Sequence, residues 1–280
     1  MGRIFSWEEI EHGKIPELKS FREVVEKVRK ELAFNEKVET AILCGSALRD
    51  DLSITSDIDC VVIYNDETVF LALKGLIAYA KALYVPLEII PIDIRMIKMG
   101  IHSLNGSFLQ HLKRVAKEGG IIKGDPILIF RPTEDNRTNS YTKLRDTFEE
   151  ISSKLNRALC ELSRFEGEKR IFNLGKILEA PMDIVRQIIW AQEIPIINES
   201  KEEVLKAFWT IADKTSKKLL VKVLEVDEEY SELLEKILKQ SAPGPYKDEY
   251  IGILKKIEEI GQNEALEFIV YNAQLLTQEI

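Results

Sequence analysis

Residues 43–60 read LCGSALRDDLSITSDIDC, and the rest of the sequence is best interpreted outward from this segment. The apolar run Val38–Cys44 predicts a buried strand, and Ile58–Tyr64 predicts a second one. Between them, Gly45 and Ser46 predict a turn that opens a helix. A helix N-terminus exposes backbone N–H groups, so this turn is suited to phosphate, with the glycine permitting close approach and the serine adding a hydroxyl.

Two carboxylates stand at the start of the second predicted strand, Asp57 and Asp59. Because strand side chains alternate between faces, both are expected to point the same way while Ile58 packs inward. Carboxylates placed in this way can share divalent cations that also bind phosphate oxygens. Two like charges so close together are unfavourable on their own, so a metal ion is the simplest compensation.

This order of features resembles the signature of the DNA polymerase β nucleotidyltransferase superfamily. The signature is an apolar strand, Gly-Ser or Gly-Gly, a spacer of about ten residues, and Asp-apolar-Asp or Glu. Every position that it specifies is filled here, by Gly45, Ser46, Asp57 and Asp59. Arg49 and Ser56 also match the version common in minimal bacterial and archaeal nucleotidyltransferases, whereas Asp50 stands where a glycine often follows that arginine.

The resemblance implies a chemistry and a set of roles. It implies a nucleoside triphosphate (NTP) substrate, ATP among the candidates, with two Mg²⁺ ions (or Mn²⁺ in their place). A nucleotidyl group is then transferred and pyrophosphate is released. Ser46, the amides near Gly45, and Arg49 would bind the nucleotide, and Asp57 and Asp59 would be catalytic metal ligands.

The family also needs a third carboxylate on an adjacent strand. Val85–Arg95 is the strand candidate, and it holds Glu88 and Asp93. Their spacing puts them on opposite faces of a regular strand, so only one can point at the site, although a bulge at Pro91 would reverse the facing. Glu88, followed by Ile-Ile-Pro, resembles a run in archaeal tRNA nucleotidyltransferases. We therefore expect Glu88 to be the third catalytic and metal-binding residue, although the family usually has Asp there.

The pattern of the chain changes near residue 131. Before that point helix-like and strand-like segments alternate, whereas from residue 141 apolar side chains recur every three or four positions, as in helices. The sequence thus predicts an α/β (α+β) nucleotidyltransferase catalytic domain with a mixed sheet over residues 1–130. An all-α helical-bundle domain is predicted over residues 131–280.

A cation from the helical domain is expected to face the phosphates. The segment FNLGK at residues 172–176 resembles a Gly-Lys segment in the helical half of kanamycin nucleotidyltransferase, whose lysine meets the triphosphate. Lys176 is therefore a candidate nucleotide-binding residue. Lys143 and Arg145 are equally good candidates from reasoning alone, and a solvated helix position is the ordinary interpretation of Lys176.

Composition narrows the class of protein. The 280 residues carry a formal net charge of -8, which argues against a protein that coats nucleic acid non-specifically. The three cysteines form no CxxC pair and indicate a reducing compartment, and neither a membrane span nor a secretory signal is visible, so we expect a cytoplasmic location. His102 and His111 lack a partner at ligand spacing, and no histidine follows them to form the ribonuclease motif of some accompanying helical (HEPN) domains.

The acceptor stays open at this point. A small-molecule hydroxyl, an RNA 3′ end and a protein hydroxyl are all compatible with the sequence, and so is a homodimer. The alternative of a different class is a non-catalytic or antitoxin-type binding module, which uses the fold to neutralise a partner protein. Binding of metal and NTP would separate the two classes.

Overall fold

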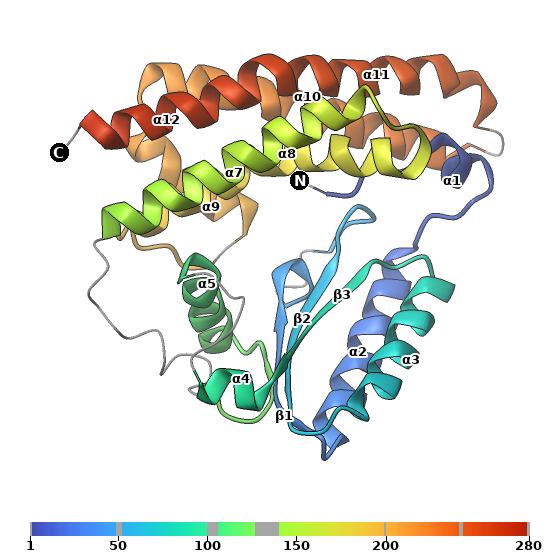
Figure 1. Ribbon diagram of the computed structural model, residues 1–280. Helices are drawn as coiled ribbons and strands as arrows, with labels where there is room; N and C mark the ends of the chain where they lie inside the picture. The colour runs from blue at the N-terminus through green and yellow to red at the C-terminus, as the bar shows by residue number, and fades with distance from the viewer. Residues whose placement is uncertain are drawn as a thin grey trace. The chain divides into compact units, whose positions relative to one another are not determined.

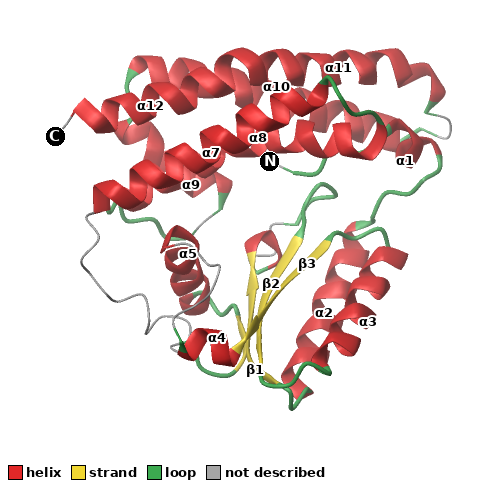
Figure 2. Ribbon diagram, viewed as in Figure 1, coloured by secondary structure: helices red, strands yellow, loops and turns green. Residues whose placement is uncertain are grey.

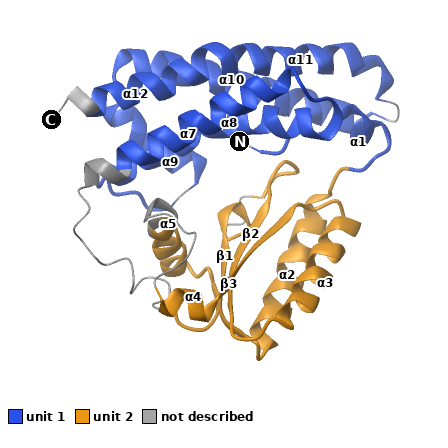
Figure 3. Cartoon of the chain, viewed as in Figure 1, with its two compact units in different colours: residues 1–14, 140–280 blue, residues 15–139 orange. Residues whose placement is uncertain are grey.

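The computed structural model describes residues 2–48, 52–99, 106–126, 140–198, 200–240 and 243–278. The chain divides into two compact units, one of residues 15–139 and one that joins residues 1–14 to residues 140–280 (Figure 3). The first unit is thus inserted between two segments of the second. This differs from the predicted division at residue 130, because the N-terminal segment packs with the helices.

A four-stranded mixed sheet forms the middle of the 15–139 unit, in the order β3-β2-β1-β4. Figure 2 labels β1, β2 and β3 of this sheet. Its strands are β1 (Val38–Cys44), β2 (Ile58–Tyr64), β3 (Leu87–Asp93) and β4 (Ile121–Lys123). Strand β1 runs antiparallel to β2 and β4, while β2 and β3 are parallel. The two strands predicted on either side of the Gly-Ser turn are confirmed, as is the mixed sheet.

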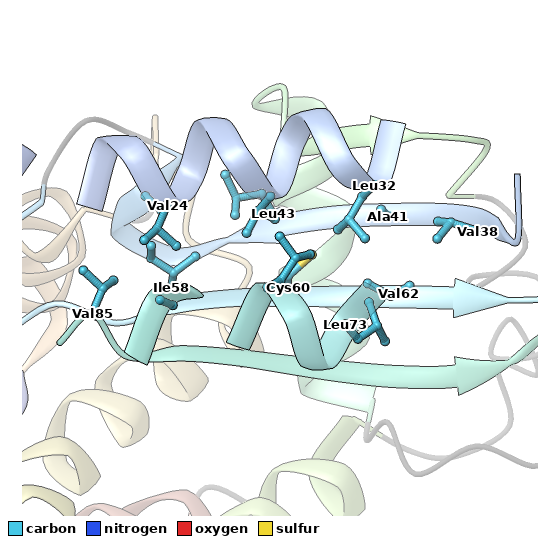
Figure 4. Close-up of a cluster of buried hydrophobic side chains, with 14 of the residues drawn as sticks. Val24, Leu32, Val38, Ala41, Leu43, Ile58, Cys60, Val62, Leu73 and Val85 are labelled. Carbon is cyan, nitrogen blue, oxygen red and sulfur yellow. The ribbon is translucent and has the colours of Figure 1, made fainter. Parts of the chain in front are cut away.

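Two helices, α2 (Leu18–Phe34) and α3 (Val69–Ala82), cover one face of this sheet (Figure 1). Apolar residues of α2 recur every three or four positions, so one side of the helix is buried. In Figure 4, Val24 and Leu32 of that side lie over Ile58, Cys60 and other strand residues. All four of these side chains are fully buried, which makes this layer the main core of the unit.

The other face of the sheet packs against the short helix α4 (Ile94–Lys98) and α5 (Gly106–Lys117). Its core consists of alternate strand residues, one position of α4 and three positions of α5: Ile42, Cys44, Val61, Ile63, Ile92, Ile97, Leu109, Leu112 and Val115. Because both faces are covered, the central strands read as nearly continuous apolar runs in the sequence.

Helices alone make up the second unit among the described residues, which confirms the predicted all-α region. Their bounds are α1 (Trp7–Glu11), α7 (Ser140–Leu162), α8 (Gly167–Ala191), α9 (Lys201–Ile211), α10 (Lys214–Leu238), η3 (Gly244–Tyr246), α11 (Lys247–Ile260), η4 (Gly261–Ala265) and α12 (Leu266–Gln278). The turn η4 is π-helical and joins α11 directly to α12. None of the described helices combines the length and apolar character needed to cross a membrane.

The N-terminal segment joins the helical unit through a pair of buried tyrosines. The Phe5 N–H donates to the Tyr230 hydroxyl at 3.0 Å, and the Tyr250 hydroxyl donates to the Phe5 carbonyl at 2.7 Å. Ile4 and Ile10 are buried alongside. Burial raises the pKa of Tyr230 to about 12, so its hydroxyl stays protonated in this contact. These bonds explain why residues 1–14 belong to the helices and not to the sheet.

Candidate active site

The end of β1 and the starts of β2 and β3 lie side by side at one end of the sheet. Cys44, the last residue of β1, pairs with Asp59 near the start of β2, because the two strands are antiparallel. On its other side Asp59 pairs with Glu88 near the start of β3, because these strands are parallel. The residues that follow β1, Gly45 and Ser46, therefore adjoin a pair of carboxylates on neighbouring strands.

The carboxylates lie on the face of the sheet that α4 and α5 cover. Asp59 alternates with Ile58 and Cys60, which are both fully buried against α2 and α3 on the other face. Glu88 is in register with Asp59 and so projects to the same face. Asp59 is half-buried, whereas Glu88 and Asp57 are exposed, so all three are accessible to a ligand from this end.

Gly45 adopts a backbone conformation that favours glycine, with φ +75°. A Cβ atom at this position would lie 3.9 Å from Asp59 Oδ2, an ordinary contact distance. The positive φ, and not a steric clash, is therefore the reason for glycine here. The same distance shows that the Asp59 carboxylate lies beside the Gly-Ser turn.

The described part of the turn is 3₁₀-helical. Gly45–Ala47 forms the 3₁₀ helix η1, and Cys44 before it is extended with φ -122°. Ser46 is half-buried in this turn. A single 3₁₀ turn exposes fewer backbone N–H groups than the opening of an α-helix. Residues 49–51 lie outside the described part of the chain, and with them the predicted nucleotide-binding residue Arg49.

Asp93 has a different role from Glu88. It caps the N-terminus of α4, where its Oδ1 accepts hydrogen bonds from the Arg95 backbone N–H at 2.7 Å and from Arg95 Nε at 2.9 Å. The hydrogen bonds from the Arg95 guanidinium and backbone hold the pKa of Asp93 below its usual value. The register between β2 and β3 is continuous through Pro91, so Asp93 pairs with Tyr64 at the far end of the strand. The structure brings Glu88, and not Asp93, to Asp59.

Pro91 lies in β3, which is an edge strand of the described sheet. Pro91 pairs with Val62 without a shift in register, so no bulge interrupts β3. Proline lacks an N–H group and is tolerated where that side of a strand has no neighbour. The alternative facing that a bulge at Pro91 would have produced is not observed.

The carboxylate oxygens of Asp57, Asp59 and Glu88 are the kind of ligand that Mg²⁺ prefers. Mg²⁺ is usually held by one or two carboxylates together with substrate phosphates and water. Among the described residues no three His, Cys, Asp or Glu side chains are gathered closely enough to hold an ion by themselves. Asp59, together with Asp57 or Glu88, would hold the ion with phosphate oxygens completing its shell. The neighbouring Cys60 is no candidate ligand, because burial and the Asp59 charge raise the pKa of its thiol to about 12.

The predicted cations of the helical unit are engaged on their own helices. Lys176 Nζ on α8 forms an ion pair with Glu179 and lies 5.4 Å from the centre of the Phe172 ring. Arg145 on α7 is paired with Asp146 at 3.2 Å and Glu149 at 3.6 Å. These contacts agree with the ordinary interpretation of a solvated helix surface, and a nucleotide contact by Lys176 stays a prediction. The Lys143 side chain and His102 lie outside the part of the chain that the structure describes.

Comparison with protein families adds an independent observation. Residues 25–122 match the family model of the nucleotidyltransferase domain. The chain carries a nucleotidyltransferase domain. The matched segment extends from within α2 to the middle of β4, so it includes Gly45, Ser46, Asp57, Asp59 and Glu88. This confirms the resemblance to the polymerase β-like superfamily, while the likeness to kanamycin nucleotidyltransferase stays a prediction. No curated protein matches the chain.

Proposed function

We propose that the protein transfers a nucleoside monophosphate from an NTP to an acceptor hydroxyl and releases pyrophosphate. The observation that carries this proposal is the register of Asp59, which lies between the end of β1 and Glu88. In this arrangement the turn at Gly45 and Ser46, which would bind phosphate, lies beside the paired carboxylates of Asp59 and Glu88 at one end of the sheet. The match of this segment to the nucleotidyltransferase domain family supports the same reaction class.

Each residue has a defined task in this reaction. Asp57 and Asp59 hold Mg²⁺, which when bound offsets the charge of the phosphates. Ser46 and the amides beside Gly45 bind the β- and γ-phosphates, and positioning of this kind supplies most of the catalysis in phosphoryl-type transfer. Glu88 orients the acceptor hydroxyl or takes its proton. The bond between the acceptor oxygen and the α-phosphorus forms as the bond to pyrophosphate breaks. Contacts to the nucleotide from Arg49 and Lys176 belong to the same proposal.

The acceptor belongs to one of three classes: a small molecule, an RNA 3′ end or a protein side chain. The net charge of -8 weighs against a long polyanion, because extended nucleic acid is bound through many lysine and arginine contacts to phosphate. A compact acceptor is therefore favoured. The reaction at the α-phosphorus is the same for all three classes.

Incubation of the protein with each α-labelled NTP and Mg²⁺ tests the proposal. Separate reactions contain tRNA, proteins from a cell lysate, or a panel of aminoglycosides and other polyols as acceptors. Transfer of label by the natural protein, lost in Asp59→Asn and kept in Asp93→Asn, supports the proposal. Asparagine is a good N-cap, so the second substitution keeps α4 capped. Absence of transfer together with absence of thermal stabilisation by Mg²⁺ and NTP contradicts the enzyme and favours the binding module.

A further inference from the structure

The loop that leads to Asp57 is closed by two reciprocal hydrogen bonds between Ser53 and Ser56. The Ser56 backbone N–H donates to the Ser53 carbonyl at 3.1 Å, as in a β-turn. The Ser53 backbone N–H donates to Ser56 Oγ at 2.9 Å. The first bond needs no particular side chain, whereas the second exists only because residue 56 carries a hydroxyl.

The chain is fixed again directly after Asp57. The Ile58 backbone N–H donates to the Pro86 carbonyl at 3.0 Å, and the ladder between β2 and β3 begins at this point. Ile58 is also fully buried in the core beneath α2 and α3. Asp57 is therefore a single exposed residue between a closed turn and the first ladder residue. Few backbone torsions are left to change the direction of its side chain.

A second contact involves the same hydroxyl. Ser53 Oγ lies 3.1 Å from Ser56 Oγ and 3.0 Å from Thr55 Oγ1, so the Ser53 hydroxyl contacts the other two hydroxyls of the turn. Of the three, only the Ser56 hydroxyl also takes part in closing the turn. This distinguishes it from its neighbours, because Ser53 contributes to both closing bonds through its backbone, and its hydroxyl adds only a contact with the Ser56 hydroxyl.

From this geometry we infer that Ser56 is a positioning residue for Asp57. Its hydroxyl closes the turn, and the closed turn presents the Asp57 carboxylate to the cation beside Asp59. The inference rests on the proposed function, since it assigns Asp57 to metal binding. Holding a ligand in place before the metal arrives lowers the loss of conformational freedom on binding. Without the hydroxyl, Asp57 would sample other directions and the cation would bind more weakly.

Three substitutions separate positioning from other effects. Ser56→Ala removes the acceptor of the Ser53 N–H, Ser56→Thr restores a hydroxyl, and Ser53→Ala removes a hydroxyl of the same turn but keeps both closing bonds. Mn²⁺ is titrated in the presence of α,β-methylene ATP, which cannot be turned over, and free Mn²⁺ is measured by electron paramagnetic resonance. The Mg²⁺ concentration for half-maximal transfer and the apparent Tm without metal are measured in parallel.

We expect Ser56→Ala to weaken Mn²⁺ binding by about three- to tenfold, less than when a direct partner of a metal ligand is lost. Ser56→Thr and Ser53→Ala should bind Mn²⁺ like the natural protein, and all Tm values should agree within about 2 °C. Unchanged Mn²⁺ binding in Ser56→Ala overturns the inference alone, and so does an equal loss in Ser53→Ala. A natural protein that neither binds Mn²⁺ nor transfers nucleotide overturns the proposed function and this inference together.

Discussion

Glu88 lies directly opposite Asp59 across the parallel ladder of β2 and β3, while Asp93 of the same strand caps α4 at the other end. The two acidic residues of β3 therefore have separate tasks, one at the candidate site and one in the fold. Substitutions of Asp59 and Glu88 should therefore affect activity, whereas a substitution of Asp93 that keeps the cap should not.

Asp59→Asn should reduce nucleotidyl transfer by about a thousandfold, since one charged ligand at the centre of the site is lost. The side chain is half-buried and the replacement has the same size, so we expect the apparent Tm to change little. Transfer of α-labelled nucleotide and a thermal melt measure the two quantities. An Asp59→Asn protein with normal activity would be incompatible with the proposed site.

Glu88→Gln should lower the turnover number by about a hundredfold or more if its carboxylate takes the proton of the acceptor. The matched control is Asp93→Asn on the same strand, which keeps a capping side chain and should retain activity. The reverse pattern of activities would assign the third carboxylate to Asp93.

Asp93 has a lowered pKa in the folded protein, so its contacts with Arg95 stabilise the fold at neutral pH. This stabilisation is lost as the pH falls through that lowered pKa, and the loss should be absent from Asp93→Asn.

Local patterns predicted much of the 15–139 unit. The strands at Val38–Cys44 and Ile58–Tyr64 were evident because both faces are buried, which leaves nearly continuous apolar runs. In contrast, Glu88 was preferred to Asp93 only on a resemblance, because which of the two faces Asp59 depends on whether the register shifts at Pro91. Register is a property of the pair of strands and not of one segment.

Contacts between residues far apart in the chain could not be predicted from the sequence. Nothing in residues 1–14 indicates that Phe5 is held by Tyr230 and Tyr250, more than two hundred residues later. Sequence reasoning also missed the role of Ser53 in closing the turn before Asp57. The available signal was a pair of serines three residues apart ahead of a strand, which fits a turn but is too common to single out a site.

Tyr250→Phe should destabilise the helical unit by about 1–3 kcal/mol, because the buried Phe5 carbonyl loses its hydrogen-bond donor. Urea unfolding followed by circular dichroism measures the change. Tyr79→Phe is the matched control, since that tyrosine is exposed on α3 and its substitution should cost little. Equal stability of the two variants would show that the hydrogen bond from Tyr250 to Phe5 contributes little to the stability of the unit.

Two glycines of the continuous helix from α11 to α12 should respond to alanine in opposite ways. A Cβ atom on Gly261 would lie 2.3 Å from Ile177 Cγ2 on α8, so the helices must move apart and the free energy of unfolding should fall by about 1–3 kcal/mol. A Cβ atom on Gly252 would meet no atom within 4 Å, so Gly252→Ala should raise stability by up to about 1 kcal/mol through helix propensity. Urea titrations of both variants measure the difference. If Gly261→Ala is as stable as Gly252→Ala, the close approach of α8 to the π-helical turn is not what requires glycine at position 261.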